Sequence, residues 1–431
     1  MFLRRSAVAL AATAVLCASA APAALADPTP ATGKALPAGL FGTGDPNYDG
    51  VWRQSLALLA LDATGARPPG EAVRWLADQQ CDDGSFVAYR PDTGKPCDPT
   101  AQPGDTNATA AAVQALAALE AHGPESAPVR EALSWLKSVQ NDDGGWPYTP
   151  GDDSDANSTA VVIGALSAAG EDPARTEPAG GGRSAYEGLA QFQLGCDAPG
   201  DERGAFDHQP EEGRLAADAM ASAAAVLGAY GAGWAKAPQD APEGGAPRCE
   251  GDERFAPGTE SARAGAAYLE RALAEHGGHL MSTLAGAEDQ PDYGTTTKAA
   301  LALGAGGRDA AAQEALDWLA RNHARWEGLT QSPAGLGELV LAVRAAGGDP
   351  ADFGGTDLVA ALAATGPAQE GADAGDTGAR DDTQADARAE DASEDDGSPA
   401  LWWIVGACVL AGVGIGMALS LRRRGGTGQR L

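Results

Sequence analysis

The sequence is poor in aromatic and basic residues. Aromatics make up 5% of its 431 residues, and 30 lysines and arginines stand against 60 aspartates and glutamates, a formal net charge of −30. Nucleic acids need basic side chains to neutralise their phosphates, so this composition argues against a nucleic-acid partner. Strand-like alternation of β-branched or aromatic residues with polar ones is almost missing too. The sequence therefore predicts an acidic, all-α protein.

Signals for a metal or a cofactor are also lacking. The six cysteines form no Cys-x-x-Cys pair, and the five histidines form no His-x-x-x-His pair. Asp153, Asp155 and Asn157 alternate like the first ligands of a calcium loop, but Ser158 and Gly164 stand where such a loop needs Gly and Glu. We expect neither a metal site nor a cofactor.

Two apolar segments mark the ends of the chain. Residues 1–26 carry two arginines, an apolar run and an Ala-Leu-Ala sequence, which is typical of a secretory signal. Residues 400–421 are uncharged and mostly apolar, and three arginines follow them. This pattern predicts a transmembrane helix whose basic end, residues 422–431, is a cytoplasmic tail.

The segment before this helix is strongly acidic. Residues 367–399 contain almost no large apolar side chain, so they cannot repay chain entropy by burial and we expect a disordered linker. The domain formed by residues 36–366 would then lie outside the cell on a single-pass anchor in the cell membrane. A membrane transporter is one partner that such a location suggests.

Four cysteines fall in the exported part of the chain. They are Cys81, Cys97, Cys196 and Cys249. An oxidising compartment favours disulfides, and four cysteines allow three pairings. Cys81 and Cys97 flank one loop, so we predict that they pair, which leaves Cys196 for Cys249.

The body of the chain alternates two helical patterns. One pattern is small and apolar on nearly all sides, as in helices buried on both faces. Its members begin at Asn47, Asp105, Asp155, Asp218, Asp292 and Pro333. The other pattern has one apolar and one polar face. Six buried patterns alternating with six amphipathic ones predict an (α/α)6 toroid of six inner and six outer helices.

A motif of the form Gln-x-x-x-Gly-x-Trp, or the same with Phe, follows the amphipathic helices. Its three copies, the third of them stretched, are Gln80, Gly84 and Phe86; Gln140, Gly144 and Trp146; and Gln193, Gly204 and Phe206. Two decayed copies lie near His276 and Asn322. Glycine permits a tight reversal, the Gln amide can bond backbone groups at helix ends, and the ring can pack over the joint.

With this QW-type repeat the chain resembles the terpenoid cyclase and protein prenyltransferase α/α-toroid superfamily. The resemblance implies the toroid fold over most of the exported domain, but the catalytic motifs do not carry over. Squalene-type cyclases use a DxDD acid, whereas Asp152-Asp153-Ser154-Asp155 has another spacing, and the Asp-x-Cys of prenyltransferase zinc sites does not occur. The chain looks more like the non-catalytic barrels of cobalamin carriers.

The starts of the buried helices are the candidate site. Four aspartates recur there and should meet at one end of the ring. Asp is a favoured N-cap, so capping is the first interpretation, and a polar ring at a cavity mouth is the second. The residues of this second interpretation are Asp105, Asp155, Asp218 and Asp292 with Asn107, Asn157 and Thr159, and Trp52, Trp146 and Tyr148 as stacking surfaces.

These observations favour a membrane-anchored, extracytoplasmic ligand-binding or transport-accessory protein. Its ligand would be a small molecule, a lipid or a glycan. The alternative is a divergent terpene or prenyl enzyme with a deep apolar cavity, or a glycan-acting (α/α)6 enzyme. The latter needs two carboxylates roughly 5 to 10 Å apart, for which Asp152, Asp153 and Asp155 are the candidates. The Pro- and Gly-rich residues 234–258 are expected to form a surface loop held by Cys249.

Overall fold

The structure is a computed structural model, and it describes six stretches of the chain. They are residues 37–42, 50–119, 122–238, 245–251, 253–283 and 290–367. The expected signal, the linker beyond residue 367, the expected transmembrane helix and the tail lie outside these residues. No helix within the described stretches is both long and apolar enough to cross a bilayer.

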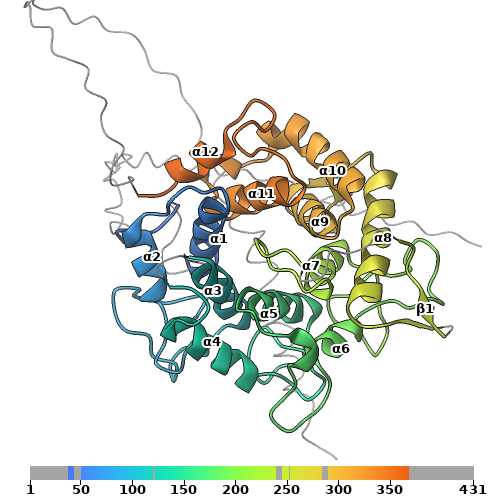
Figure 1. Cartoon of the computed structure of the whole chain (residues 1–431), viewed down its shortest axis with the longest axis horizontal. Helices are drawn as coiled ribbons and strands as arrows, with labels where there is room; N and C mark the ends of the chain where they lie inside the picture. Colours follow the sequence, from blue (N-terminus) through green and yellow to red (C-terminus); the bar gives the residue numbers. More distant parts are fainter. Residues whose placement is uncertain are drawn as a thin grey trace, which may run out of the picture. The chain divides into compact units, whose positions relative to one another are not determined.

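Six helices form a closed inner ring. Each packs against the next in the series α1, α3, α5, α7, α9 and α11, and α11 packs back against α1 (Figure 1). Their bounds are α1 Gly50–Ala63, α3 Thr106–Ala118, α5 Ala156–Ala168, α7 Ala219–Ala229, α9 Tyr293–Ala305 and α11 Pro333–Ala345. Their side chains are mostly small, so neighbours can approach closely on both sides.

Six amphipathic helices surround this ring, one after each inner helix. They are α2 Gly70–Ala77, α4 Ala127–Ser138, α6 Ala185–Ala190, α8 Thr259–Glu275, α10 Asp309–Asn322 and α12 Leu358–Ala364. Each buries one stripe, as α4 does with Trp135 and Leu136. Within the described residues, the predicted all-α toroid of six inner and six outer helices is confirmed.

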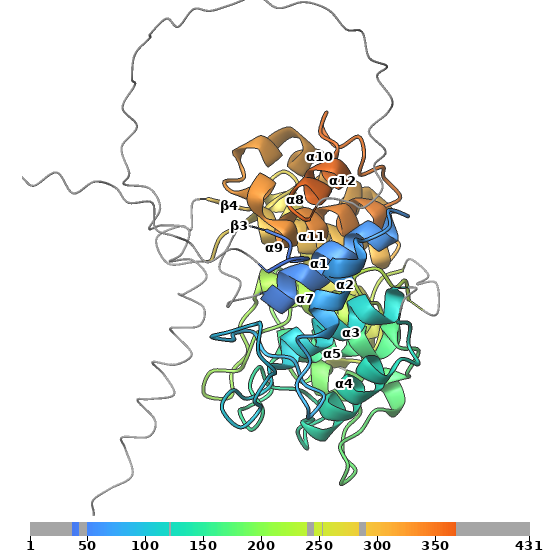
Figure 2. The same cartoon turned by 90° about the vertical axis from the view of Figure 1, so that its left-hand side faces the viewer.

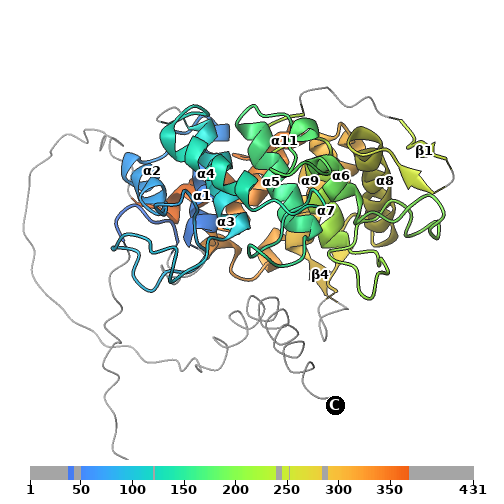
Figure 3. The same ribbon diagram turned by 90° about the horizontal axis from the view of Figure 1, so that it is seen from below.

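Strands and 3-10 helices occur only as short connections in the described residues. β1 Cys249–Glu250 pairs with β2 Arg254–Phe255, and β3 Leu280–Met281 pairs with β4 Pro291–Asp292, both antiparallel. The 3-10 helices are η1 Pro173–Arg175, η2 His323–Arg325 and η3 Leu329–Gln331. In the side views, β4 lies beyond the start of α9, on the face of the ring where the inner helices begin (Figures 2 and 3).

Two disulfides fasten the longer loops. Cys81–Cys97 closes the connection between α2 and α3, and Cys196–Cys249 ties the turn after α6 to β1. This is the pairing that the sequence predicted. Cross-links of this kind stabilise the fold chiefly by restricting the unfolded chain.

The Gln-x-x-x-Gly-aromatic turns link consecutive outer helices. In each turn the Gln amide donates one hydrogen bond to the glycine carbonyl of its own turn and one toward the next outer helix. Two of the second acceptors belong to that helix, whereas Thr176 lies in the connection before α6 and its carbonyl also accepts the N–H of Ala185, the first residue of α6. The donors and acceptors are Gln80 with Gly84 and Pro128, Gln140 with Gly144 and Thr176, and Gln193 with Gly204 and Ser261.

Each turn is also tied to the inner helix that follows it. The backbone N–H of the aromatic residue donates to a hydroxyl four residues after the capping aspartate. The pairs are Phe86 with Thr109, Trp146 with Thr159 and Phe206 with Ser222, at 2.8 to 3.0 Å. One turn therefore holds an outer helix, the next outer helix and an inner helix together.

A further copy of this turn, which the sequence analysis missed, precedes α1. Gly39 has a φ of 89°, and a Cβ there would lie 2.5 Å from the Glu71 carbonyl oxygen. Phe41 takes the aromatic place, and its N–H donates to Gln54 Oε1 at 2.9 Å. Gln54 Nε2 donates to the carbonyls of Gly39 and Ala72. Because Gln54 belongs to the inner helix, the spacing of the other copies could not reveal this one.

Candidate functional site

The four recurring aspartates cap the inner helices. Each carboxylate accepts the N–H of the residue three positions later, at 2.6 to 2.8 Å. The pairs are Asp105 with Ala108, Asp155 with Ser158, Asp218 with Ala221 and Asp292 with Thr295. Since every inner helix is followed by an outer helix that runs back, the four caps lie on one face of the ring, here called the mouth. Each carboxylate thus has a capping role.

Two of these carboxyl groups are deeply buried. Burial raises the pKa of Asp105 to about 6, against the hydrogen bonds from the Ala108 amide and the Tyr148 hydroxyl. Burial likewise raises the pKa of Asp155, which hydrogen bonds from Ser158 and the nearby His208 oppose. A buried carboxyl loses hydration in its charged form, so both groups bind a proton more readily than an exposed aspartate.

Tyr148 covers the start of α3. It lies two residues after Trp146, and its carbonyl accepts the Thr106 N–H at 3.2 Å. Its hydroxyl is hydrogen bonded to Asp105, and 44% of the residue is exposed. A side chain that is bonded at one edge and open at the other can present its ring to a ligand.

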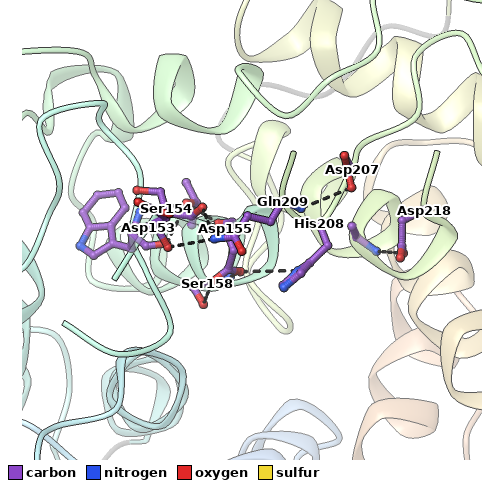
Figure 4. Close-up of polar contacts among 11 residues, drawn as sticks. Asp153, Ser154, Asp155, Ser158, Asp207, His208, Gln209 and Asp218 are labelled. Atoms are coloured by element: carbon purple, nitrogen blue, oxygen red, sulfur yellow. Dashed lines mark hydrogen bonds and ion pairs between the residues drawn. The ribbon is translucent and has the colours of Figure 1, made fainter. Parts of the chain in front are cut away.

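His208 covers the start of α5 in the same manner. It lies two residues after Phe206, and its carbonyl accepts the Ala156 N–H at 3.0 Å. Its Nδ1 atom is 3.9 Å from Asp155 Oδ1 (Figure 4), and 54% of its side chain is exposed. The sequence analysis missed His208. The signal was present, because its position after Phe206 matches that of Tyr148 after Trp146.

The segment around His208 is fastened over α5 by further polar contacts. Gln209 Nε2 donates to the carbonyls of Asp153 and Ser154, at 3.2 and 3.1 Å. Asp207 accepts the N–H groups of Gln209 and Ala216 (Figure 4). These contacts hold the backbone on both sides of His208 in place.

An open pocket of about 490 Å³ lies beside this segment. It is lined by Asn141, Asp142, Asp143, Asp152, Asp153, Ser154, Gln191, Phe192, Gln209 and Pro210. Of the carboxylates considered for glycan hydrolysis, Asp152 and Asp153 are exposed at this pocket, whereas Asp155 is buried at the cap of α5. No group of three or more His, Cys, Asp or Glu that could hold a metal ion occurs in the described stretches.

Residues two positions after the cap face the inside of the ring. Thr109 points to the turn outside α3, and Asn107, two residues earlier, lies about 200° around the helix from it. Asn157, Met220 and Trp52 occupy the corresponding positions in α5, α7 and α1. Met220 is 42% exposed, so solvent reaches the mouth there.

Trp234, in the segment that follows α7, reaches into the ring. α7 stands opposite α1 in the ring, yet the Trp234 ring lies 5.0 Å, centroid to centroid, from that of Trp52 in α1. The backbone N–H of Trp234 donates to Gln114 Oε1 in α3 at 2.9 Å. A Cβ on Gly233 would lie 2.8 Å from that same oxygen, so glycine permits the close approach. Trp234 thus points inward, which corrects the expectation for this residue, whereas residues 235–237 and 248–250 of the expected surface loop are exposed and Cys249 is bonded to Cys196.

Two residues of the predicted mouth lie elsewhere. Trp146 is 0% exposed, and its indole N–H donates to the Leu136 carbonyl at 2.7 Å. Thr159 is equally buried and holds the Trp146 N–H. Both were expected to touch a ligand. Both instead fasten the turn of Gln140 and Gly144, because the indole of Trp146 must be enclosed to pack between the helices that this turn connects. For the other residues, ligand contact stays a prediction.

Comparison with known proteins finds a short match. No family model matches the chain. Over 130 residues, 29% of this chain, it is 31% identical to drimenyl diphosphate synthase of Streptomyces showdoensis. The chain spans 22% of the length of that curated relative.

Solved structures give distant likenesses. A crystal structure of a protein from Actinoplanes has a TM-score of 0.46 at 16% identity and covers 70% of this chain and 92% of its own. Candida albicans protein geranylgeranyltransferase-I, complexed with GGPP, has a TM-score of 0.29 at 18% identity, covering 48% and 61%. The ring of inner and outer helices and the match to drimenyl diphosphate synthase support a place for this domain in the terpenoid cyclase and prenyltransferase toroid superfamily.

Proposed function

We propose that this protein is a membrane-anchored, extracytoplasmic binding protein that holds a small ligand at the mouth of the ring. The observation that carries the proposal is the position of the Trp234 side chain inside the ring. An enzyme acting on a long isoprenoid needs a deep apolar cavity, but here Trp234 crosses from α7 to Trp52 in α1. The ligand would therefore bind at the mouth and not in a cavity inside the ring of helices.

The mouth combines apolar surface with a few polar groups, the usual mixture in small-molecule sites. Tyr148 and Met220 are exposed there, and Trp52 is partly buried. Asn107, Asn157 and His208 add hydrogen-bonding groups within the same set of helix starts.

Location outside the cell is part of the proposal. The two disulfides support it, because such bonds persist in oxidising compartments. The apolar segments at 1–26 and 400–421 supply the expected export signal and anchor, and a membrane transporter would be the receiver of a captured ligand.

Native mass spectrometry on the exported domain tests the proposal. Residues 27–366 contain the whole closed ring and would be recovered from cell extract under non-denaturing conditions. We expect a retained small molecule, and we expect Tyr148→Ala to lose it while Tyr186→Ala, on outer helix α6 beside Gly231 past the end of α7, keeps it. An empty wild-type ring, or equal retention by both variants, would count against a site at the mouth.

A second candidate is an enzyme that donates a proton. Burial raises the pKa of Asp155, His208 lies beside it, and the match to drimenyl diphosphate synthase adds weight. Reading a DxDD acid from Asp153 gives Asp-Ser-Asp-Ala, so the last aspartate is replaced by Ala156. Incubation with isoprenyl diphosphates, followed by product analysis, tests this candidate. A product that disappears in Asp155→Asn would favour the enzyme over the binding protein.

A further inference from the structure

Asn107 and Asn157 occupy the same position in the neighbouring helices α3 and α5. The Oδ1 atom of each is buried and accepts no hydrogen bond in the described part of the protein. A buried acceptor without a partner costs free energy, and an apolar side chain would avoid that cost. At this position α1 and α7 do carry apolar residues, Trp52 and Met220. The two amides therefore come at a cost to stability.

A third unpaired group lies in the same turn of α3. Thr106 is fully buried, and its Oγ1 has no hydrogen-bond partner among the described residues. Its N–H is bonded to the carbonyl of Tyr148, the aromatic residue that covers this helix start. Unpaired buried polar groups are uncommon in native proteins. Of the nine such atoms in the described residues, three lie together at two adjacent helix starts, and this grouping indicates a partner that the protein itself does not supply.

The carboxyl groups beside these amides are hydrogen-bond acceptors. Asp105 and Asp155 cap the same two helices, and within the described stretches no lysine or arginine forms an ion pair with either. The Nδ1 atom of His208 lies 3.9 Å from Asp155 Oδ1. A ligand that enters this part of the mouth meets amide and carboxyl oxygens, with the His208 imidazole beside them.

We infer that Asn107 and Asn157 bind the ligand and that the ligand reaches them with hydrogen-bond donors, namely hydroxyl, amide N–H or ammonium groups. A diphosphate or another polyanion is rejected, because it brings only acceptors and negative charge beside the Asp105 and Asp155 carboxyl groups and the two amide oxygens. This inference rests on the proposed binding function and names the ligand class that the mouth selects.

The first test needs no ligand. The double variant Asn107→Leu and Asn157→Leu removes both unpaired oxygens, so we expect the urea midpoint of the empty protein to rise. Gln114→Leu is the matched control. Its amide oxygen accepts from Trp234 and its Nε2 donates to the Val161 carbonyl, so this change should lower the midpoint. A double variant less stable than the wild type would show that the amides are structural and would overturn the inference.

The second test uses three probes and isothermal titration calorimetry. They are N,N′-diacetylchitobiose with hydroxyl and amide donors, spermidine with ammonium donors, and inorganic pyrophosphate. We expect the wild type to bind at least one of the donor-bearing probes, the double variant to bind it at least tenfold more weakly, and neither to bind pyrophosphate. Pyrophosphate binding, equal donor binding by both proteins, or no donor binding at millimolar concentration would overturn the inference. If native mass spectrometry of the wild type still shows a retained molecule, the proposed binding function holds even when one of these results overturns the inference.

Discussion

The first and second halves of the ring make the same turn with different side chains. In the first half a Gln amide, a glycine and an aromatic residue build it, as in Gln140, Gly144 and Trp146. In the turn after α8, Gly278 keeps a φ of 95° and the Leu280 backbone N–H still donates to the Thr296 hydroxyl at 3.0 Å. Leu280 replaces the aromatic ring, and Ala274 stands where the Gln would be. The backbone reversal is thus the part that the toroid needs.

In the second half, a row of packed aromatic side chains takes the place of the contacts that the Gln amide and the aromatic residue make in the first half. His279 stacks on Trp318 at 4.3 Å, and Tyr293 lies 5.2 Å from Trp318 and 5.6 Å from Trp326. Its inner helices also differ, since Lys298 in α9 pairs with Glu338 in α11 at 2.7 Å. Aromatic packing from separate segments can hold a joint that a motif holds elsewhere. A repeat can therefore disappear from the sequence and persist in the fold.

The largest difference between the halves should come from the turn glycines. We expect Gly144→Ala to cost about 4 kcal/mol of unfolding free energy, because alanine is strained at a φ of 85° and its Cβ would lie 2.6 Å from the Arg183 carbonyl oxygen. Gly278→Ala should cost less, since its Cβ would lie 3.0 Å from the Glu314 carbonyl oxygen. Urea denaturation of both variants measures the difference.

Gly151→Ala is the control for backbone strain alone. Its φ is 90°, and an added Cβ would meet nothing within 4 Å, so we expect a loss of about 1 kcal/mol. Equal losses at Gly144 and Gly151 would show that the close approach to the next outer helix contributes nothing.

The buried cap of α3 should make stability depend on pH. The pKa of Asp105 is raised from 3.8 to about 6 in the folded protein. Between these values the folded state keeps a proton that the unfolded state releases, so stability falls as pH rises through this window. The change should amount to about 3 kcal/mol. Asp105→Asn keeps a good cap and should remove this contribution.

Unfolding free energies at pH 4 and pH 7 check this prediction, taken as the difference between wild type and variant. Asp292→Asn, at the less buried cap of α9, serves as the second-half control. An unchanged pH dependence in Asp105→Asn would mean that this carboxyl is not the group responsible.

The smallest of the three effects concerns the Gln amide. Gln140→Ala removes donations to the Gly144 and Thr176 carbonyls and should cost about 2 kcal/mol. Gln191→Ala removes one bond, to the Gly188 carbonyl of its own helix, and should cost less than half as much. Thermal unfolding of the pair gives the comparison. Similar losses of stability in the two variants would mean that the hydrogen bond from Gln140 to the Thr176 carbonyl adds no stability.

The amino-acid sequence alone determined the ring. Stretches of small apolar residues alternate with amphipathic stretches. The apolar stripe of each amphipathic helix must be covered, so the helices close into two layers with the small apolar helices inside. The capping aspartates and the pairing of Cys81 with Cys97 were also readable, because they depend on residues close along the chain. Local spacing is the information that a single sequence carries best.

Tertiary structure decided what the ring contains and what its mouth presents. Gln54 serves the turn of Phe41 from the inner helix, and Trp234 reaches Trp52 on the opposite side of the ring. Trp146 matches a stacking residue by type, yet it is sealed in the core. These outcomes follow from which helices face one another after closure, and contacts between segments far apart in the chain leave no spacing in the sequence to read.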